Sequence, residues 1–199
     1  MASGIMTITA LRSANALPAN GPGIVAEKYR SLSPDGLEMI KHLRTFLGNC
    51  KYDLVISSPA TRAIETARIM SGQREGIIQL ENLYPWGLGT EAMTAGQANH
   101  TKSFHYYLCH RIGGEIFRNQ TQIALSQIKE LIGNDDGDAR SILIVGSGAL
   151  LMAVAWEAYP LEFMEFIKNL SRYSLGEAEG FRLAIDPRSN LANFEPIPD

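Results

Sequence analysis

Residues 52–70 read YDLVISSPATRAIETARIM, and the fold expected for the whole chain rests on this stretch. Residues 54–56 form a short apolar run, which is typical of a buried strand. Ser58 is a suitable N-cap, and Pro59 suits the first helical position because the N–H that proline lacks would be unpaired there. The sequence therefore predicts a strand that passes directly into a helix, with apolar residues at helical spacing: Ala60, Ala63, Ile64, Ala67 and Met70.

Arg62 falls in the first turn of this predicted helix, just beyond the carboxyl end of the strand. Ligands of open α/β sheets bind at that end of the strands. A helix N-terminus and a guanidinium group together suit an anion. The spacing also allows a simpler interpretation, in which Arg62 only pairs with Glu65.

The composition is that of an ordinary soluble protein, with 199 residues, 45% apolar residues and a net charge of −3. This charge does not favour nucleic-acid binding. Two cysteines, Cys50 and Cys109, are too few for a disulfide framework, and we see no signal peptide or apolar run of membrane-spanning length. We therefore expect a cytoplasmic protein that neither enters a membrane nor binds nucleic acid.

Strand-like and helix-like segments alternate along the rest of the chain, which predicts an α/β fold. Apolar spacing in the long helix predicts that Ile116, Ile123 and Leu131 face the core together with Ala124 and Ile128. The expected strands are 5–11, 77–80, 141–145 and 180–185, and the expected helices are 33–47, 115–132 and 149–158.

The pattern Ser57-Ser58-Pro59-x-x-Arg62-Ala63-x-Glu65-Thr66-Ala67 resembles a signature of the histidine phosphatase superfamily, the phosphoglycerate-mutase-like proteins. The turn at Arg12, the helix start at 33–36, the turn at 146–148 and the last strand follow in the family's order. The resemblance implies a three-layer α/β/α sandwich with a mostly parallel sheet. It also implies one domain over residues 1–199, with an insertion near 84–113 that covers the pocket.

Both histidine positions of the resembled family hold serine in this chain. The family has Arg-His-Gly where this chain has Arg12-Ser13-Ala14, and a second catalytic histidine where it has Ser147. A serine hydroxyl needs a base or a metal to activate it, and none is evident beside Ser13. We therefore expect the chain to be catalytically inactive.

The resemblance assigns the remaining site residues. It implies that Arg12, Arg62, Asn15 and Ser58 bind phosphate, so that the partner is an inorganic anion or a phosphorylated small molecule. It also implies a general acid after the strand at 77–80. Glu81 is our candidate for this acid and Glu91 the second choice, because the register between them is uncertain.

Two other motifs are weaker. Gly146-Ser147-Gly148 is neither a dinucleotide fingerprint, which would need glycine where Leu151 stands, nor a nucleophile elbow, which would need glycine at 145 and 149. His105 and Cys109 are spaced for one helix face, but they lack a further ligand pair. We therefore predict no metal and no cofactor.

Three functions remain open at this stage. The first is a non-catalytic protein that binds a phosphorylated ligand, which we favour. The second is an interaction or scaffold protein with a vestigial pocket. The third is an active phosphatase or mutase with an atypical nucleophile, in which His100, His105 or His110 substitutes for the missing histidines.

Overall fold

The computed structural model describes residues 4–85, 114–133, 140–168, 175–186, 189 and 191–197. Within these residues a single sheet has six strands in the order β3-β2-β4-β1-β5-β6. Its strands are β1 (Met6–Arg12), β2 (Leu54–Ser57), β3 (Ile78–Gln79), β4 (Ser141–Gly146), β5 (Gly180–Asp186) and β6 (Leu191–Ile197).

Four neighbouring strands of this sheet run parallel, since β3 pairs with β2, β2 with β4, and β4 with β1 in the same direction. The last two strands reverse, because β5 is antiparallel to β1 and β6 is antiparallel to β5. The predicted mostly parallel sheet is confirmed. The sequence prediction missed β6, an edge strand whose side chains are mostly exposed.

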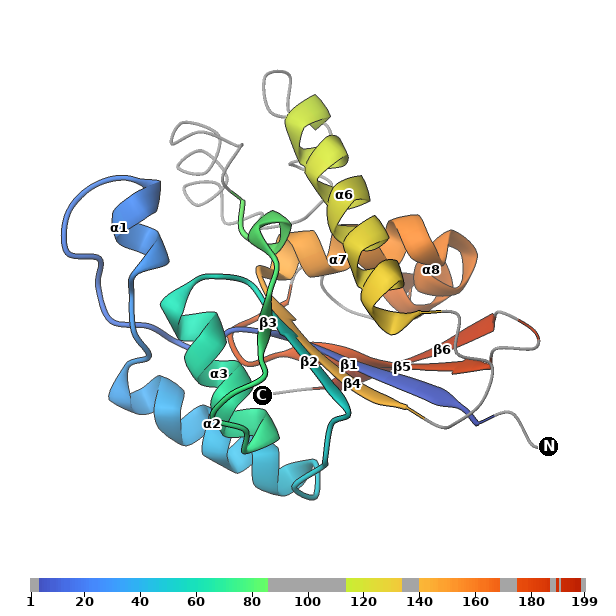
Figure 1. Cartoon of the computed structure of the whole chain (residues 1–199), viewed down its shortest axis with the longest axis horizontal. Helices are drawn as coiled ribbons and strands as arrows, with labels where there is room; N and C mark the ends of the chain where they lie inside the picture. The colour runs from blue at the N-terminus through green and yellow to red at the C-terminus, as the bar shows by residue number, and fades with distance from the viewer. Residues whose placement is uncertain are drawn as a thin grey trace.

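Helices cover both faces of the sheet, as Figure 1 shows. α2 (Pro34–Phe46) and α3 (Thr61–Ser71) lie on one face, and α6 (Gly114–Ile132), α7 (Gly148–Ala158) and α8 (Pro160–Lys168) lie on the other. The short α1 (Ile24–Lys28) lies beyond the carboxyl ends of the parallel strands. Two apolar clusters fill the two sheet–helix layers. The expected three-layer α/β/α sandwich is therefore confirmed.

The helix after β2 begins later than predicted. Its N-cap is Ala60, and Ser58 stays extended because its N–H continues the sheet by donating to the Val145 carbonyl at 2.8 Å. The Ser58 hydroxyl instead accepts from the Ala60 N–H at 3.2 Å. The prediction of Ser58 as N-cap and Pro59 as first helical residue is therefore wrong by two positions.

The buried side of α6 matches the prediction only in part, since Ala124 and Ile128 are buried as expected. Ile116 and Ile123 are 46% and 40% exposed, whereas the polar residues Gln120 and Thr121 are buried. The Thr121 hydroxyl donates to a carbonyl of its own helix, and the Gln120 amide donates to the Tyr84 carbonyl. Thr121 is therefore buried with its hydroxyl bonded, whereas Gln120 is buried with its amide nitrogen bonded and its Oε1 without a hydrogen-bond partner.

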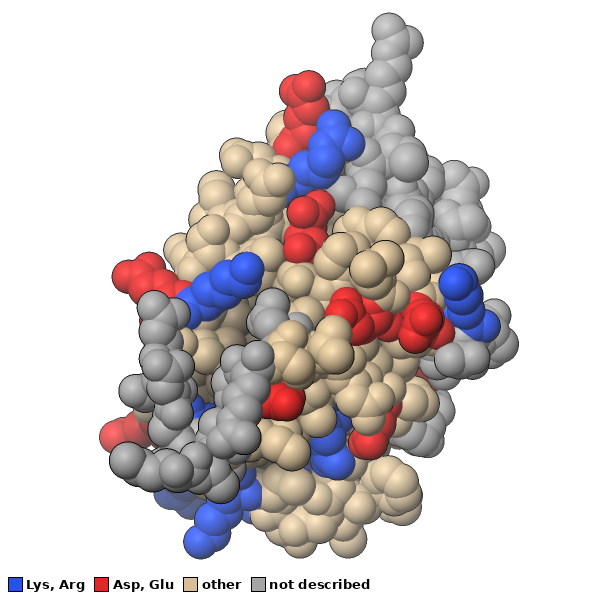
Figure 2. Space-filling model, turned by 90° about the vertical axis from the view of Figure 1, so that its right-hand side faces the viewer, with Lys and Arg blue, Asp and Glu red and all other residues tan. Residues whose placement is uncertain are grey.

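The surface at one end of the molecule is of mixed charge. Figure 2 views the right-hand side of Figure 1, and on this face acidic and basic side chains are interspersed among other residues. The described residues there form no continuous basic band of the kind that binds nucleic acid. No helix within the described ranges combines the length and the apolar character that crossing a membrane requires.

Candidate functional site

Three turns meet at the carboxyl edge of the parallel strands. Arg12 at the end of β1 pairs in register with Gly146 at the end of β4, and Ser57 at the end of β2 pairs with Val145. Backbone bonds continue past these ends, since the Ser13 N–H donates to the Gly146 carbonyl at 3.3 Å. The residues that follow the three strands, Ser13, Ser58 and Ser147, therefore lie side by side along one edge of the sheet.

Ser13 and Ser147 differ in their surroundings. Ser13 is only 7% exposed. The next N–H, that of Ala14, donates to the Thr66 hydroxyl at 3.3 Å, and Thr66 in turn donates to the Arg62 carbonyl at 2.7 Å. Ser147 is half-buried and is the N-cap of α7, but its hydroxyl makes no capping bond. Among the described residues, no three histidine, cysteine or acidic side chains gather where they could hold a metal.

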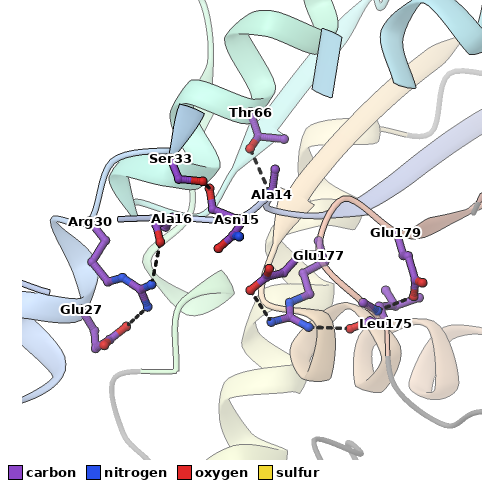
Figure 3. Close-up of polar contacts among 12 residues, drawn as sticks. Ala14, Asn15, Ala16, Glu27, Arg30, Ser33, Thr66, Leu175, Glu177 and Glu179 are labelled. Atoms are coloured by element: carbon purple, nitrogen blue, oxygen red, sulfur yellow. Dashed lines mark hydrogen bonds and ion pairs between the residues drawn. The ribbon is translucent and has the colours of Figure 1, made fainter. Parts of the chain in front are cut away.

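The Arg12 guanidinium lies against the turn that precedes β5. Its Nη1 donates to the Leu175 carbonyl at 2.7 Å, and its Nη2 lies 3.5 Å from Glu177 Oε1. A side chain at position 148 would crowd this arginine, because a Cβ there would lie 3.1 Å from Arg12 Cδ. Gly148 therefore leaves room for the stem of Arg12, and Glu177 supplies an internal counter-ion (Figure 3).

The turn that carries Glu177 is fixed by the neighbouring Glu179. Glu179 is only 4% exposed, and its carboxylate accepts from the Gly176 N–H. Its carbonyl accepts from the Arg12 N–H at 2.8 Å. Ala178 between the two glutamates has a φ of 59°, a conformation that costs a non-glycine residue free energy. The chain is thus bent so that Glu177 stands beside Arg12.

Arg62 projects from α3 toward α1. Its Nη1 donates to the Glu27 carbonyl at 2.6 Å, and its side chain is hydrogen-bonded to Tyr84. Burial lowers the pKa of Arg62; Tyr84 and Glu27 act in the opposite direction, and Arg30 lowers it further. Glu65 accepts instead from the Leu32 N–H at 2.7 Å, so the simpler interpretation of an Arg62–Glu65 pair is wrong.

Asn15 connects the first turn to α2. Its carbonyl accepts from the Ser33 N–H at 3.0 Å, and a Cβ at Gly36 would lie only 2.1 Å from that carbonyl oxygen. In Figure 3 the Asn15 side chain points away from Ser33, into the space between the Glu27–Arg30 pair and Glu177. The amide is therefore directed toward the same region as Glu177.

Glu81 begins the short 3-10 helix η1 (Glu81–Leu83) that follows β3. Its side chain is 64% exposed, and its Oε1 lies 3.6 Å from the Nζ of Lys28 at the end of α1. The alternative acid Glu91 lies outside the described residues, as do His100, His105, Cys109, His110 and most of the expected insertion.

Comparisons with known proteins identify the family. The model of the histidine phosphatase superfamily (branch 1) matches residues 25–181. The chain belongs to the histidine phosphatase superfamily. No curated protein matches the sequence.

Solved structures of histidine phosphatases share the fold at low sequence identity. A phosphoglycerate mutase from Bacillus anthracis matches with a TM-score of 0.64 and 19% identity, over 98% of this chain and 93% of that one. The α-ribazole phosphatase of Shigella flexneri matches with a TM-score of 0.63 and 15% identity, over 98% of this chain and 96% of that one. A phosphoserine phosphatase of Entamoeba histolytica, in complex with 3-phosphoglyceric acid, matches with 0.61 and 16%, over 98% of both chains.

The sequence prediction missed several residues around the carboxyl edge of the parallel strands. Glu177, Tyr84 and Glu27 contact the two arginines, yet each comes from a segment that carries no motif. Thr66 lies inside the quoted signature, but its role as acceptor for the Ala14 N–H depends on a contact 52 residues away in sequence. The local pattern contains no signal for such contacts.

Proposed function

We propose that this histidine phosphatase-fold protein binds a phosphorylated small molecule, or free phosphate, without transferring the phosphoryl group. The observation that carries the proposal is that Ser13, Ser147 and Arg12 lie at one edge of the sheet. The resemblance implies that the two serines stand at the family's histidine positions and that Arg12 and Arg62 match its phosphate-binding arginines. Arginine binds phosphate oxygens with charge-assisted, bidentate hydrogen bonds.

Within the part of the chain that the structure describes, no hydrogen bond joins the Ser13 hydroxyl to a base, which supports the proposal of no phosphoryl transfer. A serine hydroxyl is a poor nucleophile unless a neighbouring group accepts its proton. The Thr66 hydroxyl, which accepts from the Ala14 N–H, cannot serve as that base near neutral pH. Phosphate monoesters are among the slowest uncatalysed substrates, so an unactivated hydroxyl leaves the barrier almost untouched.

Hydrogen bonds to the backbone orient both arginine side chains before any anion binds. Arg12 and Arg62 already donate to the carbonyls of Leu175 and Glu27, which fixes their guanidinium groups. Burial disfavours the charge of Arg62, so an anion that contacts it would gain an interaction in a weakly screened environment. Asn15 and Ser58 complete the proposed set, with Glu81 as the first candidate for the family's acid and Glu91 as the second.

Replacing Arg62 by alanine is expected to weaken phosphate binding by roughly 10- to 150-fold, because a charged hydrogen bond contributes about 1.5–3 kcal/mol. Calorimetric titration with inorganic phosphate at two salt concentrations measures this. The matched control is Arg68→Ala, which removes an exposed arginine from the same helix and should leave affinity unchanged. Equal affinity in parent and Arg62→Ala would reject the proposed site and favour the scaffold function.

Replacing Glu177 by glutamine is expected to strengthen phosphate binding. The Glu177 carboxylate neutralises Arg12 and would repel an incoming anion, but it is 41% exposed and therefore partly screened by water. An increase of about two- to fivefold in affinity follows from a surface ion pair of this kind. The same titration measures it, with Glu38→Gln on the exposed side of α2 as control. A loss of affinity in Glu177→Gln would mean that Glu177 itself contacts the ligand.

A further inference from the structure

A cavity lies between the sheet and helices α6 and α7, away from the proposed phosphate site. Its volume is about 250 Å³. Three alternate residues of β1, Met6, Ile8 and Ala10, form part of its floor, so it runs back along β1 toward the strand's amino end. The cavity is therefore separate from the turns at Ser13 and Ser147, which lie at the carboxyl end.

The walls of this cavity are apolar and well buried. Side chains from three strands and two helices face it, and most are less than a tenth exposed. The buried apolar residues that line it are Ile8, Ala10, Ile128, Ile144, Leu151, Val154, Ala155, Phe181, Leu183 and Ile185. Such a space repels water, because water needs polar partners that these walls lack.

The size and shape favour a chain-like ligand. An apolar cavity of about 150 Å³ in another protein stays dry and binds benzene, so 250 Å³ accommodates a larger apolar group. The floor from Met6 to Ala10 spans roughly 13 Å at the rise of a β-strand. An elongated aliphatic chain fits this outline better than a single ring does.

The polar groups of the lining are few and lie toward the ends of the two helices. Lys129, in the last turn of α6, is the only charged residue among those described as lining the cavity, and none of them is acidic. Arg140 donates to the Ile132 carbonyl at the same helix end and offsets the negative end of the helix dipole. Two basic residues, Lys129 and Arg140, thus lie at this end of α6, beside the exposed Glu130.

Tyr159, at the end of α7, supplies the other polar group of the lining. Burial, and after it the negative charge of Glu162, raise the pKa of Tyr159. Its hydroxyl therefore stays protonated near neutral pH and is able to donate a hydrogen bond.

We propose that this cavity binds a medium-chain aliphatic carboxylate, with the chain between α6, α7 and the sheet and the carboxylate at Lys129 and the Tyr159 hydroxyl. The proposal is independent of the phosphate site, because none of the lining residues belongs to that site. It assigns the protein a second ligand class, recognised by apolar burial and one cation.

Calorimetric titration with decanoate tests the cavity in the intact protein. Ala155 is only 3% exposed and lies on the wall, so Ala155→Leu fills the space and should weaken decanoate binding by more than about tenfold. The thermal midpoint of this variant should stay equal or rise, since added apolar atoms fill a void. The proposal would be overturned if decanoate gave no binding heat with the parent protein. It would also be overturned if Ala155→Leu bound decanoate with the same affinity as the parent.

Variants of Lys129 test recognition of the carboxylate without altering the walls. Lys129→Gln should weaken decanoate binding about two- to fivefold and leave decanol binding unchanged, whereas Lys129→Arg should retain decanoate. Decanol binding as tightly as decanoate to the parent would overturn the assignment of the ligand class. Decanoate affinity should be the same in Arg62→Ala as in the parent. A failure of the cavity proposal is therefore distinguishable from a failure of the proposed phosphate site.

Discussion

The double variant Ser13→His with Ser147→His is expected to acquire phosphoryl transfer, an activity that we propose the parent protein lacks. Both positions follow neighbouring parallel strands, so two imidazoles would stand at the same sheet edge. Neutral imidazole attacks phosphorus near pH 7 without further activation, unlike a serine hydroxyl. The expected result is a trapped phosphohistidine and measurable hydrolysis of a chromogenic phosphate ester.

The gain should stay well below that of an intact active site. Ser13 is 7% exposed, and the resemblance implies a glycine where Ala14 stands, so a histidine at position 13 must displace its neighbours. A misplacement of about 1 Å costs roughly a hundredfold in rate. Adding Ala14→Gly should therefore raise the recovered rate, and Glu81→Gln should lower it if Glu81 is the acid.

The parent protein supplies the reference for this experiment. Between about pH 4 and pH 9 it should match a buffer blank with the same ester, because it has no imidazole at either position. Parent turnover that disappears in Ser13→Ala would make Ser13 the nucleophile and contradict the proposed inactivity. A folded double variant in which no phosphohistidine is trapped would count against the assignment of positions 13 and 147.

Replacing Gly180 by alanine is expected to destabilise the fold by about 3 kcal/mol or more, because overpacking against backbone cannot relax easily. A Cβ at Gly180 would lie 2.1 Å from the Ala10 carbonyl oxygen and 2.7 Å from Leu11 Cδ2. Since Gly180 pairs with Leu11, β1 and β5 would have to separate at this point. Urea unfolding measured by circular dichroism should show a lower midpoint.

Gly146→Ala is the matched control for this substitution. Gly146 lies at the end of β4, on the other side of β1, and a Cβ there would meet its nearest neighbours at 3.6 Å, an ordinary contact. Its unfolding midpoint should change little. If Gly180→Ala were as stable as Gly146→Ala, the close approach of β1 and β5 at this position would be contradicted.

Local patterns were sufficient to predict the parallel part of the sheet. The run at 54–56 and the segment 141–145 are apolar and short, and both are buried strands in the structure. The start of the helix after β2 and the buried side of α6 were less predictable. Ser58 remains in the sheet because of a bond to Val145, and the buried Gln120 donates its amide N–H to the Tyr84 carbonyl. Both outcomes depend on partners that are distant in sequence.

The candidate site shows the same contrast between residues that local motifs identify and contacts that come from distant parts of the chain. Arg12 and Arg62 could be selected from motifs, but their partners could not. Arg12 contacts Leu175, which is 163 residues further along the chain, and Arg62 contacts the Glu27 carbonyl of a helix that no motif predicts. Only the folded chain brings these groups together, so the sequence identified the arginines without the acceptors that hold them.

The position of β1 in the sheet has a consequence for biosynthesis. β1 leaves the ribosome first, yet its two partners are β4 and β5, which end at Gly146 and Asp186. At about 5–20 residues per second, translation leaves this apolar strand without either neighbour for roughly 7 to 27 seconds. Ile8, Ala10 and Leu11 are buried in the finished fold, and we expect them to be exposed during that interval. We therefore expect the nascent chain to depend on slow, non-local pairing and to be prone to aggregation until β4 is made.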